Sequence, residues 1–195
     1  MAINLQLGLM EDQHAAAAAL YWQAFGGKLG PVMGPEARAL TYLLRVIRPD
    51  HVIAALSADG EVVGIAGFKT TKGSFASGSP ADLNAVYGRI GGLWRGTLLR
   101  WIGDDVDNER FLVDGICVKD TARGQGIGTA LLAALAAEAR LRGYGAVRLD
   151  VIDSNHRAIA LYERQGYAVV KRQPIGLLRH VFGFAAALTM VRTLT

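Results

Sequence analysis

Residues 111–141 read FLVDGICVKDTARGQGIGTALLAALAAEARL, and the rest of the chain is organised around this stretch. Its first eight residues are mostly apolar and rich in β-branched side chains, which predicts a buried β-strand. The glycine-rich run RGQGIG at residues 123–128 then turns the chain. Residues 129–142 repeat apolar side chains at the spacing of one helix face: Leu131, Leu132, Leu135 and Ala139. The stretch therefore predicts a strand, a glycine-rich turn and a long helix.

The glycine-rich turn is suited to binding an anion. Glycines allow backbone N–H groups to approach a ligand closely, and they adopt positive φ values. The first turn of the following helix has unpaired N–H groups at the positive end of the helix dipole, which a diphosphate would satisfy. Arg123 adds a cation beside them. Two other phosphate-binding loops do not match, because Thr129 stands where one requires a lysine and the other a third glycine.

A second motif follows the first at a suitable distance. Residues 155–162 read NHRAIALY and continue into ERQGY. With the Arg-Gly-x-Gly-x-Gly loop before it, this Asn-x-x-Ala-x-x-Leu-Tyr motif resembles the GCN5-related N-acetyltransferase (GNAT) superfamily. The resemblance covers residues 111–171 and extends more loosely over the whole chain. Two motifs in the right order make it far more specific than a glycine-rich loop alone.

The composition is that of one globular domain. The chain has 195 residues, of which 51% are hydrophobic and 19% charged, enough for a substantial core. A single cysteine excludes a disulfide framework, and four scattered histidines lack metal-ligand spacing, so we expect no metal. The net charge of +4 is spread along the chain, which disfavours nucleic acid as a partner. Early acidic residues and the lack of a long apolar run predict a cytoplasmic protein with no signal peptide and no membrane partner.

Sequence patterns and the resemblance together predict an α/β fold. We expect a single GNAT-like domain over residues 1–195, with a mixed, mostly antiparallel central β-sheet of about seven strands flanked by helices. Strands are predicted at residues 3–7, 52–57, 62–69, 111–118, 146–151, 167–172 and 185–193, and helices at 14–25, 36–46, 129–142 and 155–165. Gly26 and Gly27 are expected to end the first of these helices, and Asp153 or Ser154 to cap the last.

Residues 70–108 form an insertion before the fourth predicted strand, where the superfamily often has only a short turn. Residues 72–80 predict a flexible loop, and residues 81–101 predict one or two amphipathic helices. Trp94 and Trp101 in this segment are interpreted as core or dimer anchors, with a lid over the acceptor as the alternative.

The resemblance implies acetyl-CoA as co-substrate. The loop would bind its diphosphate, and the strand before the loop would splay from its neighbour so that its backbone binds the pantetheine arm. A main-chain N–H near Val118 would face the thioester carbonyl. The cofactor-binding residues implied in this way are Ile116, Cys117, Val118, Arg123, Gly124, Gln125, Gly126, Ile127, Gly128, Thr129, Asn155 and Tyr162.

Two side chains are predicted to carry the chemistry. Tyr162 is the candidate general acid, because a phenol is protonated at neutral pH and can donate to a departing thiolate. Asp114 is the candidate general base, since a carboxylate inside an apolar strand is costly without a role or a partner; a structural acid is the alternative, and Glu109 is the second choice of base. Asn155 would bind the cofactor arm or cap its helix. Cys117 is interpreted as a small buried residue and not as an acyl-carrying nucleophile.

The predicted function is acetyl transfer from acetyl-CoA to a primary amine by direct attack in a ternary complex. The acceptor could be a small-molecule amine, a protein N-terminus or a lysine, and neither the acceptor nor the acyl chain length is fixed by the sequence. The alternative is a non-catalytic acyl-CoA-binding sensor or regulatory module, which would have no need of an acid at Tyr162. The resemblance also allows a homodimer.

Overall fold

The computed structural model of the protein describes residues 2–103, 109–176, 179 and 183–194. Its strands are β1 (Ile3–Leu7), β2 (Val52–Ser57), β3 (Val62–Thr70), β4 (Gly73–Ser74), β5 (Phe111–Val118), β6 (Ala146–Ile152), β7 (Ala168–Pro174) and β8 (Ala186–Thr193). Its α-helices are α1 (His14–Met33), α2 (Glu36–Val46), α3 (Pro80–Gly103), α4 (Ile127–Leu141) and α5 (His156–Arg164). Short 3₁₀ turns span Glu11–Gln13, Pro49–His51 and Asp120–Ala122.

One eight-stranded mixed sheet organises the chain. Its order is β1-β2-β3-β5-β6-β8-β7, and the two-residue β4 pairs with β3 outside this path. Every pair is antiparallel except β5–β6, which is parallel. Parallel neighbours need a crossover connection, and α4 supplies it. The predicted α/β class and mostly antiparallel sheet are confirmed, with the short β4 as an additional strand.

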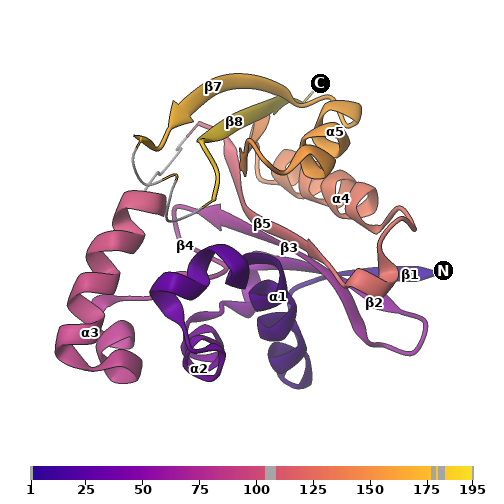
Figure 1. The fold of residues 1–195 in the computed structure, drawn as a ribbon. Coiled ribbons are helices and arrows are strands. Elements are labelled where there is room, and N and C mark those ends of the chain that lie inside the picture. Colours follow the sequence, from indigo (N-terminus) through magenta and orange to yellow (C-terminus); the bar gives the residue numbers. More distant parts are fainter. Residues whose placement is uncertain (1, 104–108, 177–178, 180–182, 195) are drawn as a thin grey trace.

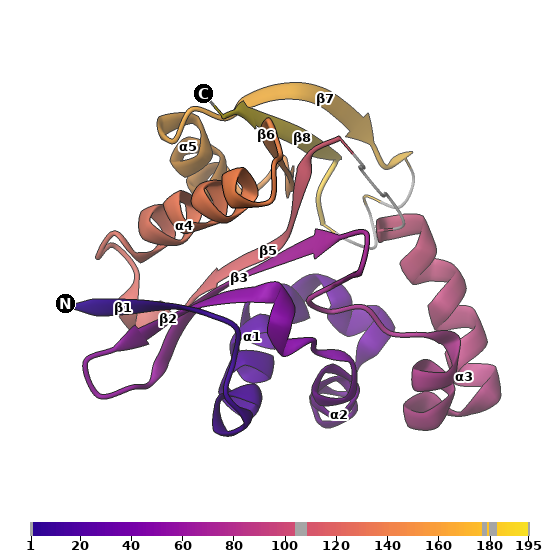
Figure 2. The same cartoon turned by 180° about the vertical axis from the view of Figure 1, so that it is seen from behind.

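Helices cover both faces of the sheet. Figures 1 and 2 show α1 and α2 on one side and α4 and α5 on the other. The α4 face is filled by the leucines that the helical spacing predicts, and Leu131, Leu132 and Leu135 are fully buried. On the α1 face, Ile65 of β3 and Cys117 of β5 pack against α1 and α2. β5 therefore lies between two apolar layers, at the centre of the molecule.

The first helix extends beyond its predicted end. α1 continues through Gly26 and Gly27 to Met33. A Cβ at Gly26 would lie 2.8 Å from Cε2 of Trp22, so this glycine lets the indole lie against the helix backbone. Each glycine inside a helix costs about 1 kcal/mol. The helix also contains Gly30 and Pro31, and a proline inside a helix costs about 3 kcal/mol. The burial of Val32 and Met33 in the last turn, at about 1.5–3 kcal/mol each, offsets much of this cost.

The predicted helical insertion is present as α3, and its apolar stripe is buried only in part. Gly88 has φ of +73° and divides the helix at a kink. Before the kink, Tyr87 is buried and its hydroxyl donates to the carbonyl oxygen of Met33 (2.6 Å). After it, Ile90 and Leu93 are 86% and 74% exposed, so the kink turns this part of the stripe away from the core. No helix within the described ranges is long and apolar enough to cross a membrane.

Candidate active site

The site begins where β5 and β6 separate. The two parallel strands pair only at Phe111–Val147 and Leu112–Arg148. β5 continues to Val118, and along this second half it pairs with β3 alone. The sheet therefore has an opening between β5 and β6, as the resemblance implied.

The edge of β5 that borders this opening presents backbone groups that lie outside the strand ladder. Lys119 N–H donates to Val63 O on β3 (2.9 Å). Because successive residues of a strand point their N–H and C=O groups to opposite edges, Cys117 also faces β3, whereas Ile116 and Val118 face the opening. Two of the three residues predicted to bind the pantetheine arm thus present their backbone to the opening, and the backbone of Cys117 does not.

A β-bulge interrupts β5 beside the opening. Gly67 of β3 lies opposite Gly115, and Phe68 lies opposite Val113, so Asp114 is the extra residue. A bulge re-aims side chains, and here both Asp114 and Gly115 meet the α1 face. A Cβ at Gly115 would lie 2.8 Å from Cζ of Phe25. Glycine at this position lets α1 lie directly on the bulge.

Asp114, the predicted base, is a partnered carboxylate. Its Oδ2 accepts a hydrogen bond from the N–H of Ala76 (3.0 Å), in the segment after β4. Burial raises the pKa of Asp114 above its usual range, although this N–H and the nearby Lys69 oppose the shift. A carboxylate with a raised pKa is a better proton acceptor for an amine, so partnering and catalysis are compatible here.

Sequence reasoning missed two aromatic residues at the bulge. Tyr21 and Phe25 lie one turn apart on α1, with ring centroids 4.6 Å apart. The pKa of Tyr21 is raised well above 10 by burial, and next by Asp114. The i, i+4 spacing places both rings on one helix face, but the sequence does not say which strand that face meets.

The glycine-rich turn has the geometry of an anion site. Gly124 and Gly126 have φ of +80° and +81°, and Gly126 is the N-cap of α4. The first backbone bond of the helix runs from Ala130 N–H to Gly126 O (3.0 Å). The N–H groups before it are not used by the helix ladder and carry the positive end of the dipole. They belong to the predicted residues Ile127, Gly128 and Thr129.

Arg123 folds back toward the end of β5. Its Nε donates to the carbonyl oxygen of Val118 (3.3 Å), and its Nη2 lies 2.5 Å from Oδ1 of Asp120. Both charged side chains are about half exposed, so this ion pair contributes at most about 1 kcal/mol. An arriving diphosphate can therefore compete for the guanidinium.

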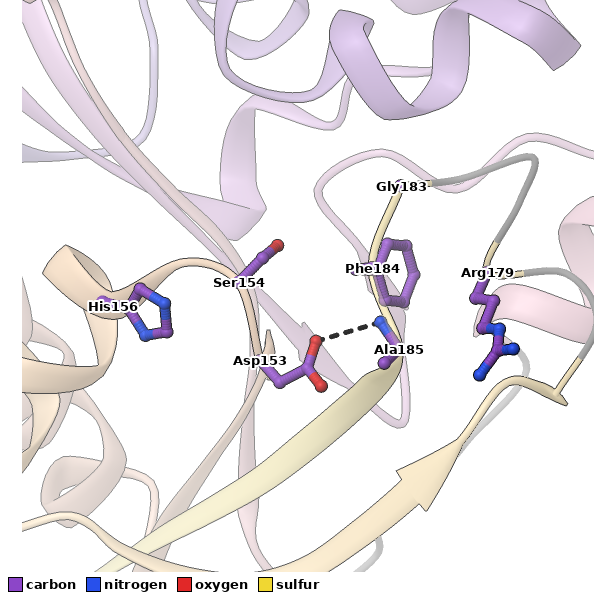
Figure 3. A pocket seen from close by; sticks show the side chains of 7 residues that line it. All are labelled: Asp153, Ser154, His156, Arg179, Gly183, Phe184 and Ala185. Atoms are coloured by element: carbon purple, nitrogen blue, oxygen red, sulfur yellow. Dashed lines mark hydrogen bonds between the residues drawn. The ribbon is translucent and has the colours of Figure 1, made fainter.

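Asn155 caps α5, which is the second of its two predicted roles, whereas the predicted caps Asp153 and Ser154 do not. Its Oδ1 accepts from Ala158 N–H (3.3 Å). Asp153 is used elsewhere, since its Oδ1 accepts from Ala185 N–H (3.1 Å), just before β8, as Figure 3 shows. The cap occupies the amide oxygen of Asn155, and its NH₂ group is a separate donor.

Tyr162 reaches from α5 toward β5. Its pKa is raised to about 12, first by burial and then by Cys117 and Tyr167. The ring of Tyr167 is 6.0 Å away. Tyr162 is therefore protonated at neutral pH and lies near the strand whose backbone borders the opening.

Cys117 is a poor nucleophile. It is 2% exposed, and burial raises the pKa of its thiol to about 12. The thiol is therefore protonated at neutral pH, whereas the thiolate is the reactive form.

Three tyrosines with raised pKa values predict that the protein loses stability at alkaline pH. Burial raises the pKa of Tyr42, Tyr162 and Tyr167 to about 12, from 10 in the unfolded chain. Because the folded pKa is the higher one, their stabilisation is complete below pH 10 and is lost as pH rises toward 12. Each group contributes at most about 3 kcal/mol. Urea unfolding should show that the free energy of unfolding falls between pH 10 and pH 12. The Tyr167→Phe variant should show a smaller fall. A free energy of unfolding that does not change over this pH range would contradict the burial of these phenols.

A wide hollow of ≈540 Å³ lies beside the end of β6 (Figure 3). It is bordered by the β6–α5 turn and by the chain that leads into β8. Its lining residues are Asp153, Ser154, His156, Arg179, Gly183, Phe184 and Ala185.

No group of three histidine, cysteine, aspartate or glutamate residues within the described ranges is arranged to hold a metal ion. The end of the predicted insertion, at residues 104–108, lies outside the described residues.

Solved structures share the fold of this chain. It has the fold of a crystal structure described as an acetyltransferase (TM-score 0.64, 22% identity, 98% of this chain and 100% of that one). It is also similar to the ribosomal-protein-S18-alanine N-acetyltransferase from Escherichia coli (TM-score 0.59, 16% identity, covering 100% of this chain and 95% of that one). A GCN5-related N-acetyltransferase from Kribbella flavida matches over 99% of this chain and 98% of its own (TM-score 0.63, 17% identity).

The sequence comparison with protein families covers most of the chain. The acetyltransferase (GNAT) family matches residues 14–167, which include α1, the glycine-rich turn and the whole of α5. This match contains both motifs and the two strands that splay apart. The chain is a member of the acetyltransferase (GNAT) family.

Proposed function

We propose that the protein transfers the acetyl group of acetyl-CoA to a primary amine, by direct attack within a ternary complex. The observation that carries this proposal is the opening between β5 and β6, which is bordered by backbone groups outside the strand ladder and approached by Tyr162. The N–H groups at the start of α4, which the helix ladder does not use, lie beyond the end of the same strand.

Each part of acetyl-CoA has a matching set of groups. The diphosphate would bind the N–H groups of the turn, from Gln125 to Thr129, with Arg123 as counter-ion. The pantetheine arm would lie along β5 and bond the backbone of Ile116 and Val118, with the amide NH₂ of Asn155 as a further donor. The N–H of Val118 would polarise the thioester carbonyl and stabilise the oxyanion that forms there.

The transfer step would need two proton movements. An ammonium acceptor first loses one proton to Asp114, and the neutral nitrogen attacks the thioester carbon. The C–N bond forms and the C–S bond breaks as the oxyanion collapses. Tyr162 donates its proton to the leaving thiolate, and the second proton lost by nitrogen restores the phenol through solvent. The products are the N-acetyl amine and free CoA, with one net proton released.

Substituting Asp114 by asparagine tests the base. The amide of Asp114→Asn keeps an oxygen that can accept from Ala76 N–H, so the fold around the bulge should be retained. Loss of general-base catalysis should lower kcat/KM for the amine about 10²-fold and remove the acidic limb of its pH profile. Asp59→Asn, in the exposed β2–β3 turn, is the matched control. An unchanged pH profile would assign Asp114 a purely structural part.

The reaction itself is tested by calorimetry with acetyl-CoA, followed by a thiol-release screen over amines and peptides with free N-termini or lysines. Binding followed by release of CoA with some amine is the expected result. Binding without release from any acceptor would favour a non-catalytic acyl-CoA sensor, and no binding would refute the proposal. Longer acyl-CoA thioesters in the same screen would report the acyl chain preference.

A further inference from the structure

The part of α3 that follows Gly88 turns large apolar side chains toward solvent. Ile90 and Leu93 are 86% and 74% exposed, and Trp94 is 45% exposed. Residues at i, i+3 and i+4 share one face of a helix, so these three side chains form one continuous surface, here called the α3 stripe. The exposure of Trp94 also shows that it is not the core anchor that the sequence allowed.

Small residues occupy the opposite face of this helix, which packs on the rest of the protein. Gly92 is buried, and a Cβ at this position would lie 2.9 Å from the backbone nitrogen of Asn84. Gly96 follows four residues later, and its Cβ would lie 3.4 Å from Cδ1 of Leu83. A surface helix normally buries its large apolar residues and exposes its polar ones. This helix buries glycines and exposes large apolar residues, so the folding of the chain does not account for the α3 stripe.

Arginines border the α3 stripe on both sides. A helix has about 3.6 residues per turn, so Arg89 and Arg95 project to opposite flanks of it. The guanidinium of Arg95 lies 4.3 Å from the centroid of the Trp94 ring, and Arg89 is exposed. The apolar surface is therefore flanked by positive charge.

No acidic residue offsets these charges along the helix. The sequence has three arginines and no aspartate or glutamate from Leu83 to Gly103, and the next acid is Asp104. Asp82, the acid before this range, is paired with Arg45 of α2 (2.7 Å). Along its length after the kink the helix thus carries charge of one sign only, which attracts an anionic surface.

We propose that the α3 stripe binds the surface of an anionic lipid bilayer. Ile90, Leu93 and Trp94 enter the boundary between headgroups and acyl chains, and Arg89 and Arg95 bind lipid phosphates. Tryptophan favours this depth, because its ring is apolar and its N–H is polar. The expectation of no membrane partner rested on the lack of a long apolar run, which a spanning helix needs; a helix that lies along the interface needs only one apolar face.

Charge favours a bilayer over a second copy of the chain as the occupant. Two copies that paired through the α3 stripe would bring their arginines together around one interface, where like charges repel. Lipid phosphates supply the opposite charge. Figures 1 and 2 show α3 beyond α2, at the end of the molecule away from α4. Binding there leaves the glycine-rich turn uncovered, so the inference does not depend on the acetyl transfer proposed above.

Co-sedimentation with lipid vesicles tests the proposal. The partition coefficient of the protein should be about 10- to 30-fold higher on equimolar phosphatidylserine–phosphatidylcholine vesicles than on phosphatidylcholine alone, because two arginines lie near the lipid surface. Replacing both Ile90 and Leu93 with glutamine should lower the coefficient on anionic vesicles at least about tenfold, since their burial in the bilayer is lost. Arg89→Gln should lower it too, and should weaken its dependence on salt concentration.

Each variant has a matched control outside α3. Leu141 is 84% exposed at the end of α4, so Leu141→Gln removes an exposed leucine at a remote site and should leave the partition coefficient unchanged. Arg157→Gln, at an exposed position of α5, is the control for Arg89→Gln. The thermal unfolding of all these variants should match that of wild type, because none of the replaced side chains is buried.

The fluorescence of Trp94 reports its depth in the bilayer. The chain has three tryptophans, so the difference in emission between wild type and Trp94→Phe isolates the signal of this one. That emission should shift to shorter wavelength on anionic vesicles, and lipids brominated along their acyl chains should quench it. Emission that neither shifts nor is quenched would contradict the insertion of the stripe.

The remaining outcomes are equally decisive. Failure of wild-type protein to bind anionic vesicles, or equal binding to neutral ones, would overturn the proposal, as would equal losses in Leu141→Gln and in the variant with both Ile90 and Leu93 replaced. Light scattering without lipid tests the alternative occupant, since a dimer that the double variant dissociates would assign the stripe to a second copy. The affinity for acetyl-CoA should be the same in the double variant and wild type, so the bilayer inference and the transfer reaction can fail independently.

Discussion

Replacing Gly126 with glutamate should lower the affinity for acetyl-CoA at least about 100-fold. Gly126 has φ of +81°, a conformation that costs a residue with a Cβ about 1–2 kcal/mol. The glutamate also brings a negative charge to the N-terminus of α4, where the diphosphate would bind. Each charge-assisted N–H contact that is lost costs about 1.5–3 kcal/mol, and charge repulsion adds to this. Together these costs exceed the binding free energy of about 2.7 kcal/mol that corresponds to a 100-fold loss of affinity. Calorimetric titration with acetyl-CoA measures the effect.

Gly143→Glu is the matched control for this variant. Gly143 also has φ of +81° and lies at the other end of α4, and a Cβ added there would meet no atom within 4 Å. The substitution therefore brings the same strain and the same charge to a site remote from the turn. Thermal unfolding of both variants reports the cost of strain together with the effect of the charge on the helix dipole, which is favourable at the N-terminus of α4 and unfavourable at its C-terminus. Equal losses of acetyl-CoA affinity in the two variants would refute the assignment of the turn to the diphosphate.

Replacing Tyr162 with phenylalanine should lower kcat about 10²-fold and leave acetyl-CoA binding nearly unchanged. The substitution removes only the hydroxyl, so the packing of the ring beside Tyr167 is retained. Without this acid the thiolate must leave unprotonated, and general acids typically contribute about 10²- to 10⁴-fold. Pre-steady-state release of CoA, measured with a saturating amine, reports the chemical step directly.

Tyr167→Phe is the control for Tyr162→Phe. Burial raises the pKa of both phenols to about 12, but only Tyr162 is coupled electrostatically to Cys117 on β5. Tyr167→Phe should therefore keep its kcat. A full rate in Tyr162→Phe, or the same loss in both variants, would remove Tyr162 as the acid.

Local sequence patterns determined most elements of the fold. The strand at Phe111–Val118 and the helix at Glu36–Val46 were predicted with their observed ends, because alternation, turn residues and caps act within a few residues. α1 was predicted too short, since glycine preference is a local property while the burial of Val32 and Met33 is a tertiary one. The sequence predicts an amphipathic helix over residues 81–101, but the kink at Gly88, which leaves Ile90 and Leu93 exposed, is set by the tertiary structure.

The sequence by itself determined the chemistry that the chain can offer: the glycine-rich turn, the Asn-x-x-Ala-x-x-Leu-Tyr motif and a carboxylate inside β5. Each of these features lies within a short stretch of the chain, so the residue types and their spacing are enough to recognise it. Only the tertiary structure decided which groups share the opening. The partner of Asp114 comes from Ala76, 38 residues away, and Tyr21, which lies near Asp114, is on a helix far earlier in the chain. Strand order and register bring such residues together, and a local sequence pattern predicts neither of them.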